Sequence, residues 1–259
     1  QVSTVLWPSD RLNVAVVGIT HRGYSNIRAL KDQAVNIVAL CDVDWGESAQ
    51  KVFAEFPDAK QYKDFRRMLD KEKHIDAVVV ATPDHAHGIV ASMAIQLGKH
   101  VYCEKPLAHS IYETRLVTNL AQEYGVQTQM GNQGHSSEKI RLLKEWIDAG
   151  LVGDITEIHA WCDRPAGGGS VSFVHGQERP TGDFKVPKTL DWDLWLGPAL
   201  ERPYHPDYLP MKWRGYLDFG CGALGDFGCH TLDPAFWALD LGSPDKVLAT
   251  TTNQLPKIE

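Results

Sequence analysis

Short apolar runs alternate with amphipathic stretches through the first half of the chain. The run Ile75–Ala81 is nearly all β-branched or small, which is typical of a strand buried on both faces. Strands are expected at Leu12–Gly18, Asn36–Asp42, Gln61–Tyr62, Ile75–Ala81, His100–Cys103 and Gln127–Met130. Helices are expected between them at Tyr24–Lys31, Ser48–Phe56, Phe65–Asp70, His87–Leu97 and Ile111–Tyr124. This alternation predicts a doubly wound parallel α/β sheet.

The second half has a different pattern. Asp163–Arg214 is rich in Gly, Pro and Trp and has little periodicity, and a segment this long without elements is usually functional. The expected elements are a helix at Ser137–Ala149 that ends at Gly150, a strand at Val152–Trp161 with period-two alternation, a helix at Ala223–Leu239 and a strand at Lys246–Thr252. A domain boundary is therefore expected near Met130–His135, with one domain over residues 1–130 and another over 131–259.

Composition narrows the class of protein. Hydrophobic residues make up 43% of the 259 residues and charged residues 23%, which is the balance of a globular protein. The net charge of −7 argues against binding to nucleic acid or to an anionic membrane surface. The longest apolar stretches are too short to span a bilayer. We expect neither a nucleic-acid nor a membrane partner.

The cysteines bear on the compartment. There are five, an odd count with no CxxC pair, so a disulfide framework is not expected and a reducing compartment is favoured. We therefore expect a cytoplasmic protein. The first residue is Gln rather than Met, so an exported or periplasmic protein whose signal has been cleaved stays an alternative.

A glycine loop follows the first predicted strand. Gly18 and Gly23 occupy the first and sixth positions of a dinucleotide-binding fingerprint, but Thr20 stands at the third, where the backbone approaches the pyrophosphate. Asp42 ends the second strand, where an acidic residue binds the adenosine ribose. A carboxylate there repels a 2′-phosphate and favours NAD over NADP, and Asp44 is a rival for the role.

Two further motifs end predicted strands. ATPDHAH begins at Ala81 and EKP at Glu104, and ligands of open α/β sheets bind outside the carboxyl ends of the strands. An isolated HxH is more often a capping or packing feature than a metal site. The residues expected to bind the cofactor are Gly18, Thr20, Gly23, Asp42, Thr82, Pro83, His87, Glu104 and Lys105.

Near the end of the chain, GALGDFGCH opens the last long helix. Asp226 and His230 are four residues apart and so share one helix face, where a carboxylate could hold one imidazole nitrogen and leave the other to exchange a proton with a hydroxyl. The spacing alone fits equally a capping carboxylate and a packed His. Cys221, Cys229 and His230 lack a fourth zinc ligand, so no metal is expected.

Together these motifs give the chain a family resemblance. GITHRG, CDVD, ATPDHAH, EKP and the DxxxH of GALGDFGCH, in this order, resemble the Gfo/Idh/MocA oxidoreductases, as do MGNQGHS, GLVGDITEIHAW and LDWDLWLGPA. The resemblance implies that Lys105, Asp226 and His230 form the catalytic set. It implies NAD-dependent hydride transfer at a secondary hydroxyl of a sugar, sugar derivative or cyclitol, with His230 as the base, Asp226 orienting it and Lys105 polarising the same oxygen.

The resemblance also implies a fold for the second half. Related proteins build an α+β domain around a large, mostly antiparallel sheet, and few strand candidates for it are present, so that sheet is expected to be incomplete or truncated. A homo-oligomer is expected if the full sheet is present. The expected substrate contacts are Asn132, Gln133, His135, Trp161, Arg164 and Arg214.

Two other functions stay open. Some relatives retain NAD(H), oxidise C3 of a sugar transiently and carry out net glycoside hydrolysis or elimination. A non-catalytic sugar or nucleotide sensor is a less favoured alternative, because Lys105, Asp226 and His230 are all present.

Overall fold

The structure is a computed structural model, which describes residues 10–162 and 176–250. The chain divides into two compact units, and the division does not fall at one point along the sequence. The first unit is Gln1–Gly131 with Thr181–Pro206, and the second is Asn132–Pro180 with Asp207–Glu259. Among the described residues, no helix is long and apolar enough to cross a membrane.

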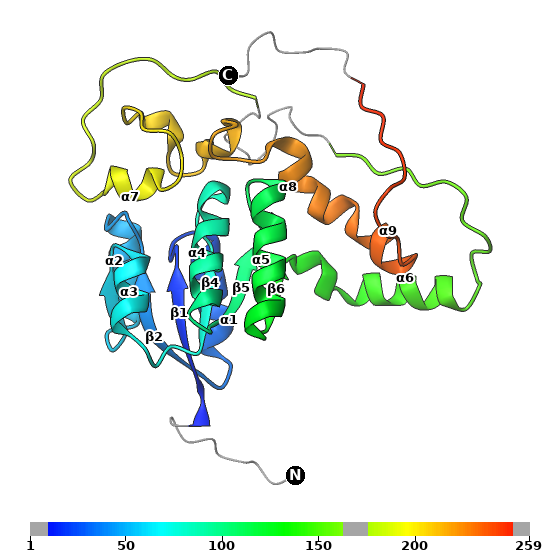
Figure 1. Ribbon diagram of the computed structural model, residues 1–259, viewed down its shortest axis with the longest axis horizontal. Helices are drawn as coiled ribbons and strands as arrows, with labels where there is room; N and C mark the ends of the chain where they lie inside the picture. Colours follow the sequence, from blue (N-terminus) through cyan, green and yellow to red (C-terminus); the bar gives the residue numbers. More distant parts are fainter. Residues whose placement is uncertain (1–9, 163–175, 251–259) are drawn as a thin grey trace. The chain divides into compact units, whose positions relative to one another are not determined.

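The first unit is built on a six-stranded parallel sheet, which confirms the predicted doubly wound fold (Figure 1). Its strands are β1 (Leu12–Val17), β2 (Val35–Cys41), β3 (Lys60–Tyr62), β4 (Ala77–Val80), β5 (His100–Glu104) and β6 (Thr128–Gly131). The strand order, β3-β2-β1-β4-β5-β6, is that of the dinucleotide-binding fold. The order in which the chain adds strands reverses between β1 and β4, although the two strands are parallel. Ligands bind at that reversal, outside the carboxyl ends of the strands.

Helices cover both faces of this sheet. They are α1 (Arg22–Lys31), α2 (Glu47–Glu55), α3 (Phe65–Lys71), α4 (Asp84–Gln96) and α5 (Ile111–Tyr124). Ala15 and Val17 of β1 point into one core with α3, α4 and α5, while Val14 and Val16 point into the other core with α1 and α2. Alternation along a strand sends successive side chains to opposite faces, so a continuous apolar run is needed to fill both cores.

Local signals set the helix ends. Ser110 accepts the N–H of Glu113, whose carboxylate accepts the N–H of Ser110 in return, and this capping box begins α5. The helix ends at Gly125, which has the left-handed conformation common after a helix. The observed strands β1 to β6 and helices α1 to α5 lie within a few residues of the predicted ones.

A later segment, Thr181–Pro206, completes the first unit. Trp45 N–H donates to the carbonyl of Thr189 at 3.0 Å, and Asp191 N–H donates to that of Val43 at 2.9 Å. The segment carries α7 (Trp192–Leu196), in which the ring of Trp192 stacks on that of Trp195 with centroids 4.8 Å apart. Its tryptophans therefore anchor a loop.

The second unit is helical in its described residues. Its longer helices are α6 (Glu138–Asp148), α8 (Gly222–Thr231) and α9 (Asp233–Ala238), and α6 packs against α9. The prediction of one helix over Ala223–Leu239 was wrong. A proline inside a helix lacks the N–H donor and clashes with the carbonyl four residues earlier, so Pro234 fits only in a first turn and a new helix begins beside it.

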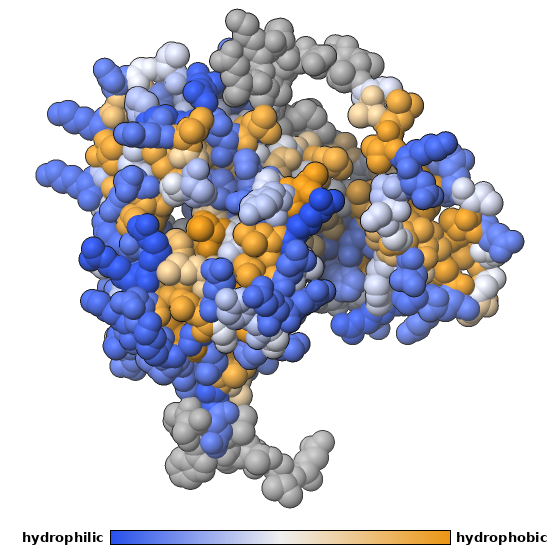
Figure 2. Space-filling view, in the orientation of Figure 1, coloured by the Kyte–Doolittle hydropathy of each residue, from blue (hydrophilic) through white to orange (hydrophobic). Residues whose placement is uncertain are grey.

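The two strands predicted for this unit are absent from its described residues. Val152–Trp161 and residues 246–250 form no strand, although the first has the alternation of one. A strand needs a partner for its backbone groups, and no sheet is present in the described residues of this unit to supply one. Apolar side chains of α6 and α9 are accordingly exposed, including Trp146 and Phe236, and hydrophobic residues gather over these helices in Figure 2.

Candidate active site

Two glycines make the turn after β1. Gly18 has φ +81°, and a Cβ added there would lie 2.6 Å from the carbonyl oxygen of Ala81, at the end of β4. A Cβ on Gly23 would lie 1.7 Å from the carbonyl oxygen of Gly18. Both positions therefore require glycine, and they bring the β1 and β4 loops together where the strand order reverses.

In the glycine loop, the positive φ of a non-glycine residue falls on His21, one residue after Thr20. The N–H of Gly23 donates to the carbonyl of Thr20 at 2.9 Å, which closes a four-residue turn. His21, at its second position, has φ 47° and ψ −109°, close to a type II′ turn, where glycine is preferred. The sequence offered no signal for this role of His21 apart from its place inside the glycine loop.

Asp42 ties the glycine loop to the end of β2. Its carboxylate accepts the N–H of Ile19 at 2.9 Å and the N–H of Asp44 at 3.1 Å. Burial raises the pKa of Asp42 to about 6, although these N–H donors act in the opposite direction. The rival Asp44 accepts the N–H of Gly46 at 3.0 Å, at the start of α2, so its carboxylate serves the helix entry.

Thr82 and Pro83 follow β4 at the same edge of the sheet. The hydroxyl oxygen of Thr82 is buried and has no hydrogen-bond partner among the described residues. A buried hydroxyl without a partner costs free energy, so a ligand group that pairs with it would be favoured. This hydroxyl, the glycine turn and the Asp42 carboxylate together fit a dinucleotide placed across the reversal between β1 and β4.

The EKP motif ends β5, with a cis peptide bond between Lys105 and Pro106. Glu104 is buried, and its Oε1 accepts from Arg22 Nε at 2.8 Å and from Asn26 Nδ2 at 2.9 Å. Both donors belong to α1, so Glu104 fastens that helix to the end of β5. Lys105 comes next, half-buried, at the carboxyl edge of the sheet.

In the second unit, His230 of α8 is held by Asn132. The Nδ2 group of Asn132 donates to the carbonyl of Cys229 at 2.7 Å, which turns its Oδ1 toward Nδ1 of His230 at 2.7 Å. Because an amide oxygen only accepts, Nδ1 of His230 carries the proton of this bond. In the neutral imidazole, Nε2 is then the basic nitrogen. The sequence placed Asn132 in the pocket but gave no signal for this contact.

Asp226 shares α8 with His230 and also faces Arg214. It is buried, and its Oδ1 lies 3.9 Å from Nε of Arg214. The guanidinium of Arg214 also lies over the ring of Trp213, 4.2 Å from its centroid. Asn132 therefore holds Nδ1 of His230, and the predicted role of Asp226 in orienting His230 stays a prediction.

Two family models match the chain. Residues 12–132 match the NAD-binding Rossmann fold of the Gfo/Idh/MocA oxidoreductase family, and residues 137–257 match the C-terminal alpha/beta domain of that oxidoreductase family. The chain belongs to the Gfo/Idh/MocA family. The predicted family, the oxidoreductase class and the NAD-binding fold are thereby confirmed.

Individual relatives in this family are moderately similar. Inositol 2-dehydrogenase 1 of Saccharopolyspora erythraea is 32% identical over 57% of this chain and 44% of that protein. The 2,7-anhydro-N-acetylneuraminate hydratase of Mediterraneibacter gnavus is 30% identical over 56% of this chain and 38% of that protein. The crystal structure of the WlbA dehydrogenase of Bordetella pertussis, in complex with NADH and UDP-GlcNAcA, is 26% identical with a TM-score of 0.52, covering 55% of this chain and 41% of that one. The chain spans less than half the length of these relatives.

The other expected substrate residues of this Gfo/Idh/MocA chain are more scattered. His135 lies with Nδ1 3.0 Å from both oxygens of Asp233, at the start of α9, and is half exposed. Gln133 is exposed, and Trp161 is 81% exposed. Arg164 lies outside the described residues. Their roles stay predictions.

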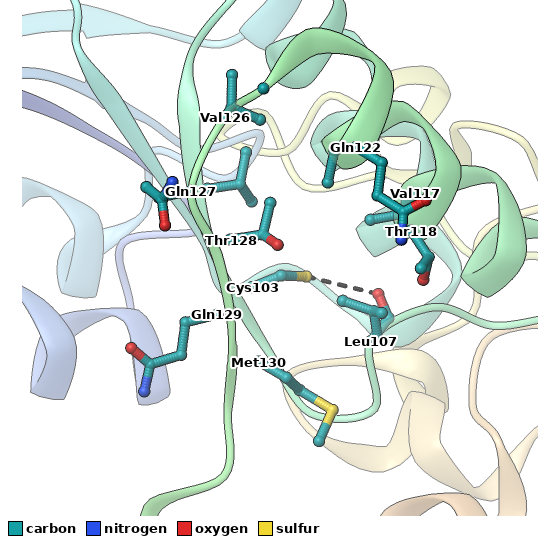
Figure 3. Close-up of a pocket in the computed structure, with 13 residues that line it drawn as sticks. Cys103, Leu107, Val117, Thr118, Gln122, Val126, Gln127, Thr128, Gln129 and Met130 are labelled. Carbon is teal, nitrogen blue, oxygen red and sulfur yellow. Dashed lines mark hydrogen bonds between the residues drawn. The ribbon is translucent and has the colours of Figure 1, made fainter.

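A pocket lies between α5 and strands β5 and β6 (Figure 3). It has a volume of about 470 Å³ and is lined by apolar side chains such as Val117, with an amide rim that includes Gln122 and Gln127. Cys103 lies in its wall, with Sγ 3.6 Å from the carbonyl of Leu107. None of the residues predicted to bind the cofactor or to act in catalysis lines this pocket.

Proposed function

We propose that this protein is an NAD-dependent dehydrogenase that transfers a hydride between nicotinamide and a secondary hydroxyl of a sugar, sugar derivative or cyclitol. The observation that carries the proposal is the fixed tautomer of His230, which leaves Nε2 as a base, in a chain that also keeps the EKP lysine at the end of β5. The inositol 2-dehydrogenase relative supports the substrate class.

The first unit would hold the cofactor. We assign the pyrophosphate to the turn from Gly18 to Gly23, whose N–H groups open α1, and the adenosine ribose to the carboxylate of Asp42. The negative charge of Asp42 favours NAD over NADP because it repels a 2′-phosphate. Thr82 would donate its buried hydroxyl to the cofactor. Bound NAD⁺ supplies the hydride acceptor.

His230 would take the proton of the substrate hydroxyl at Nε2. As its imidazole becomes positively charged, the Nδ1–H bond to Asn132 Oδ1 strengthens and keeps the ring oriented. Lys105 would polarise the same substrate oxygen and favour its loss of the proton. General acid–base assistance of this kind contributes about 10²–10⁴-fold to the rate. Lys105 belongs to the first unit and His230 to the second, so their joint action is part of the proposal.

One experiment tests both cofactor and chemistry. The purified protein is incubated with NAD⁺ or NADP⁺ and a panel of cyclitols, monosaccharides and glycosides, and NADH absorbance is followed. We expect NAD⁺-dependent turnover with at least one polyol and a loss of about 10²–10⁴-fold in His230→Ala at saturating substrate. Near-normal turnover of His230→Ala would overturn the assignment, and no response to any substrate with either cofactor would overturn the dehydrogenase proposal.

One relative favours a second function. The Mediterraneibacter gnavus protein is named a hydratase, and addition of water to a sugar is not a net oxidation. The same base and cofactor could serve such chemistry if NAD(H) is retained and returns to its starting state. Release of free sugar over many turnovers without added NAD⁺ would distinguish this function from net dehydrogenation.

The compartment and the assembly also belong to the proposal. All five cysteines are free thiols, two of them buried, which supports a reducing, cytoplasmic location. A homo-oligomer stays the expected assembly if the full antiparallel sheet of the family's second domain is present.

A further inference from the structure

His87 of α4 lies inside the first unit with both of its ring nitrogens engaged. It is 1% exposed. Nδ1 lies 2.7 Å from the carbonyl oxygen of Pro106, and Nε2 lies 2.8 Å from the carbonyl oxygen of Thr82. The side chain was expected to bind the cofactor, but neither nitrogen faces a site where a cofactor could reach it.

The two acceptors determine the protonation state. A backbone carbonyl oxygen only accepts hydrogen bonds, so each contact requires an N–H on the facing ring nitrogen. A neutral imidazole has one N–H and would set the lone pair of its other nitrogen against a carbonyl oxygen. We propose that His87 is a permanently charged imidazolium that clamps the Thr82 loop to the Pro106 loop and thereby positions Lys105.

The surroundings of His87 are consistent with a buried cation. Burial is the largest single effect and lowers the pKa of His87. Cys103, Asp84 and the carbonyl of Pro106 together outweigh burial and raise the pKa to about 10. Asp84 is itself buried in the first turn of α4.

The clamp joins two parts of the proposed cofactor edge. Thr82 follows β4, and Pro106 follows the predicted catalytic Lys105 just after β5. A second contact holds the carbonyl of Leu107, the residue after Pro106. Its oxygen lies 3.6 Å from Sγ of Cys103 (Figure 3). Two consecutive carbonyls after Lys105 are thus held from inside the unit, which restricts where its backbone can lie.

Two variants separate the halves of the clamp. An Asn amide nitrogen sits where Nδ1 of His does, and a Gln amide nitrogen where Nε2 does, so His87→Asn keeps the donor to Pro106 and His87→Gln the donor to Thr82. His85→Gln is the matched control, because Nε2 of His85 lies 3.0 Å from the carbonyl oxygen of Trp195 and Gln keeps a donor there.

The first readout is ¹⁵N NMR of the histidine rings in the free wild-type protein between pH 6 and 8.5. We expect one ring to keep both of its nitrogens protonated over this whole pH range. Its signal should disappear in both His87 variants and persist in His85→Gln. A ring that carries one proton at pH 7 would overturn the proposal. This readout needs no substrate, so it stands apart from the dehydrogenase proposal.

The second readout rests on the proposed function and compares kcat, KM and NAD⁺ affinity. His87→Gln frees the Pro106 carbonyl, so kcat is expected to fall about 10²-fold with little change in KM. His87→Asn frees the Thr82 carbonyl, so the Kd for NAD⁺ is expected to rise about tenfold with a smaller loss of kcat. Equal loss of kcat and affinity in both variants would show a general packing role and overturn the positioning role.

Discussion

Replacing Asp42 by Asn tests how the first unit chooses and holds its cofactor. The substitution keeps the shape of the side chain but removes the negative charge at the end of β2. Because an ionised carboxylate can accept from both ribose hydroxyls and repels a 2′-phosphate, we expect weaker binding of NAD⁺ and a smaller preference for NAD⁺ over NADP⁺.

The pKa of Asp42 gives this prediction a pH dependence. With a pKa of about 6, the carboxyl is ionised in about nine-tenths of molecules at pH 7 and in about one-tenth at pH 5. If the ionised form binds NAD⁺, the Kd rises about tenfold between pH 7 and pH 5. The effect on the cofactor-free fold has the opposite sign. Since burial raises the pKa, the carboxyl's favourable contribution to stability is fully present below pH 3.8 and is lost as the pH rises through 6.

Isothermal titration calorimetry of NAD⁺ and NADP⁺ at pH 7, 6 and 5 measures these changes. Asp44→Asn is the matched control, because that carboxylate accepts the N–H of Gly46 just before α2. Its charge helps to raise the pKa of Asp42, so this variant should keep the pH dependence with a lower midpoint. Thermal unfolding of each variant checks that the fold survives. The reasoning fails if Asp42→Asn binds NAD⁺ with the wild-type Kd. It also fails if the Kd for NAD⁺ depends on pH in the same way in Asp42→Asn and in the wild type.

Three further predictions concern the turn and the base. His21→Gly removes a positive φ from a residue with a Cβ and should raise the free energy of unfolding by about 1 kcal/mol in urea denaturation; a loss of stability would contradict the strain. Gly18→Ala places a Cβ 2.6 Å from the Ala81 carbonyl and should destabilise by about 2 kcal/mol or more and abolish NAD⁺ binding by calorimetry, whereas an unchanged Kd would mean that the loop can move aside. Asn132→Ala releases the tautomer of His230 and should lower kcat by about 10²-fold with KM nearly unchanged in steady-state kinetics; an unchanged kcat would rule out the positioning role of Asn132.

The pattern of apolar residues was sufficient to predict the sheet of the first unit, although not its later segment Thr181–Pro206. Continuous apolar runs such as Ile75–Ala81 predicted buried parallel strands, and the observed β4 lies within that range. The second unit was harder to predict because alternation in Val152–Trp161 describes a strand without providing its partner. The effect of Pro234 was visible in the sequence but was overlooked, although a proline ends a helix on local grounds alone.

For the site, the sequence determined which chemical groups are available and the order in which they occur. Gly18, Asp42, Lys105 and His230 were identified from motifs, because a turn, a strand end and a helix spacing are local properties. Which nitrogen of His230 keeps its proton was decided by Asn132, 98 residues away along the chain. The charge of His87 likewise depends on two carbonyls from different strand ends. Motifs are written in neighbouring residues, whereas protonation states depend on atoms that only the tertiary structure brings within hydrogen-bond distance.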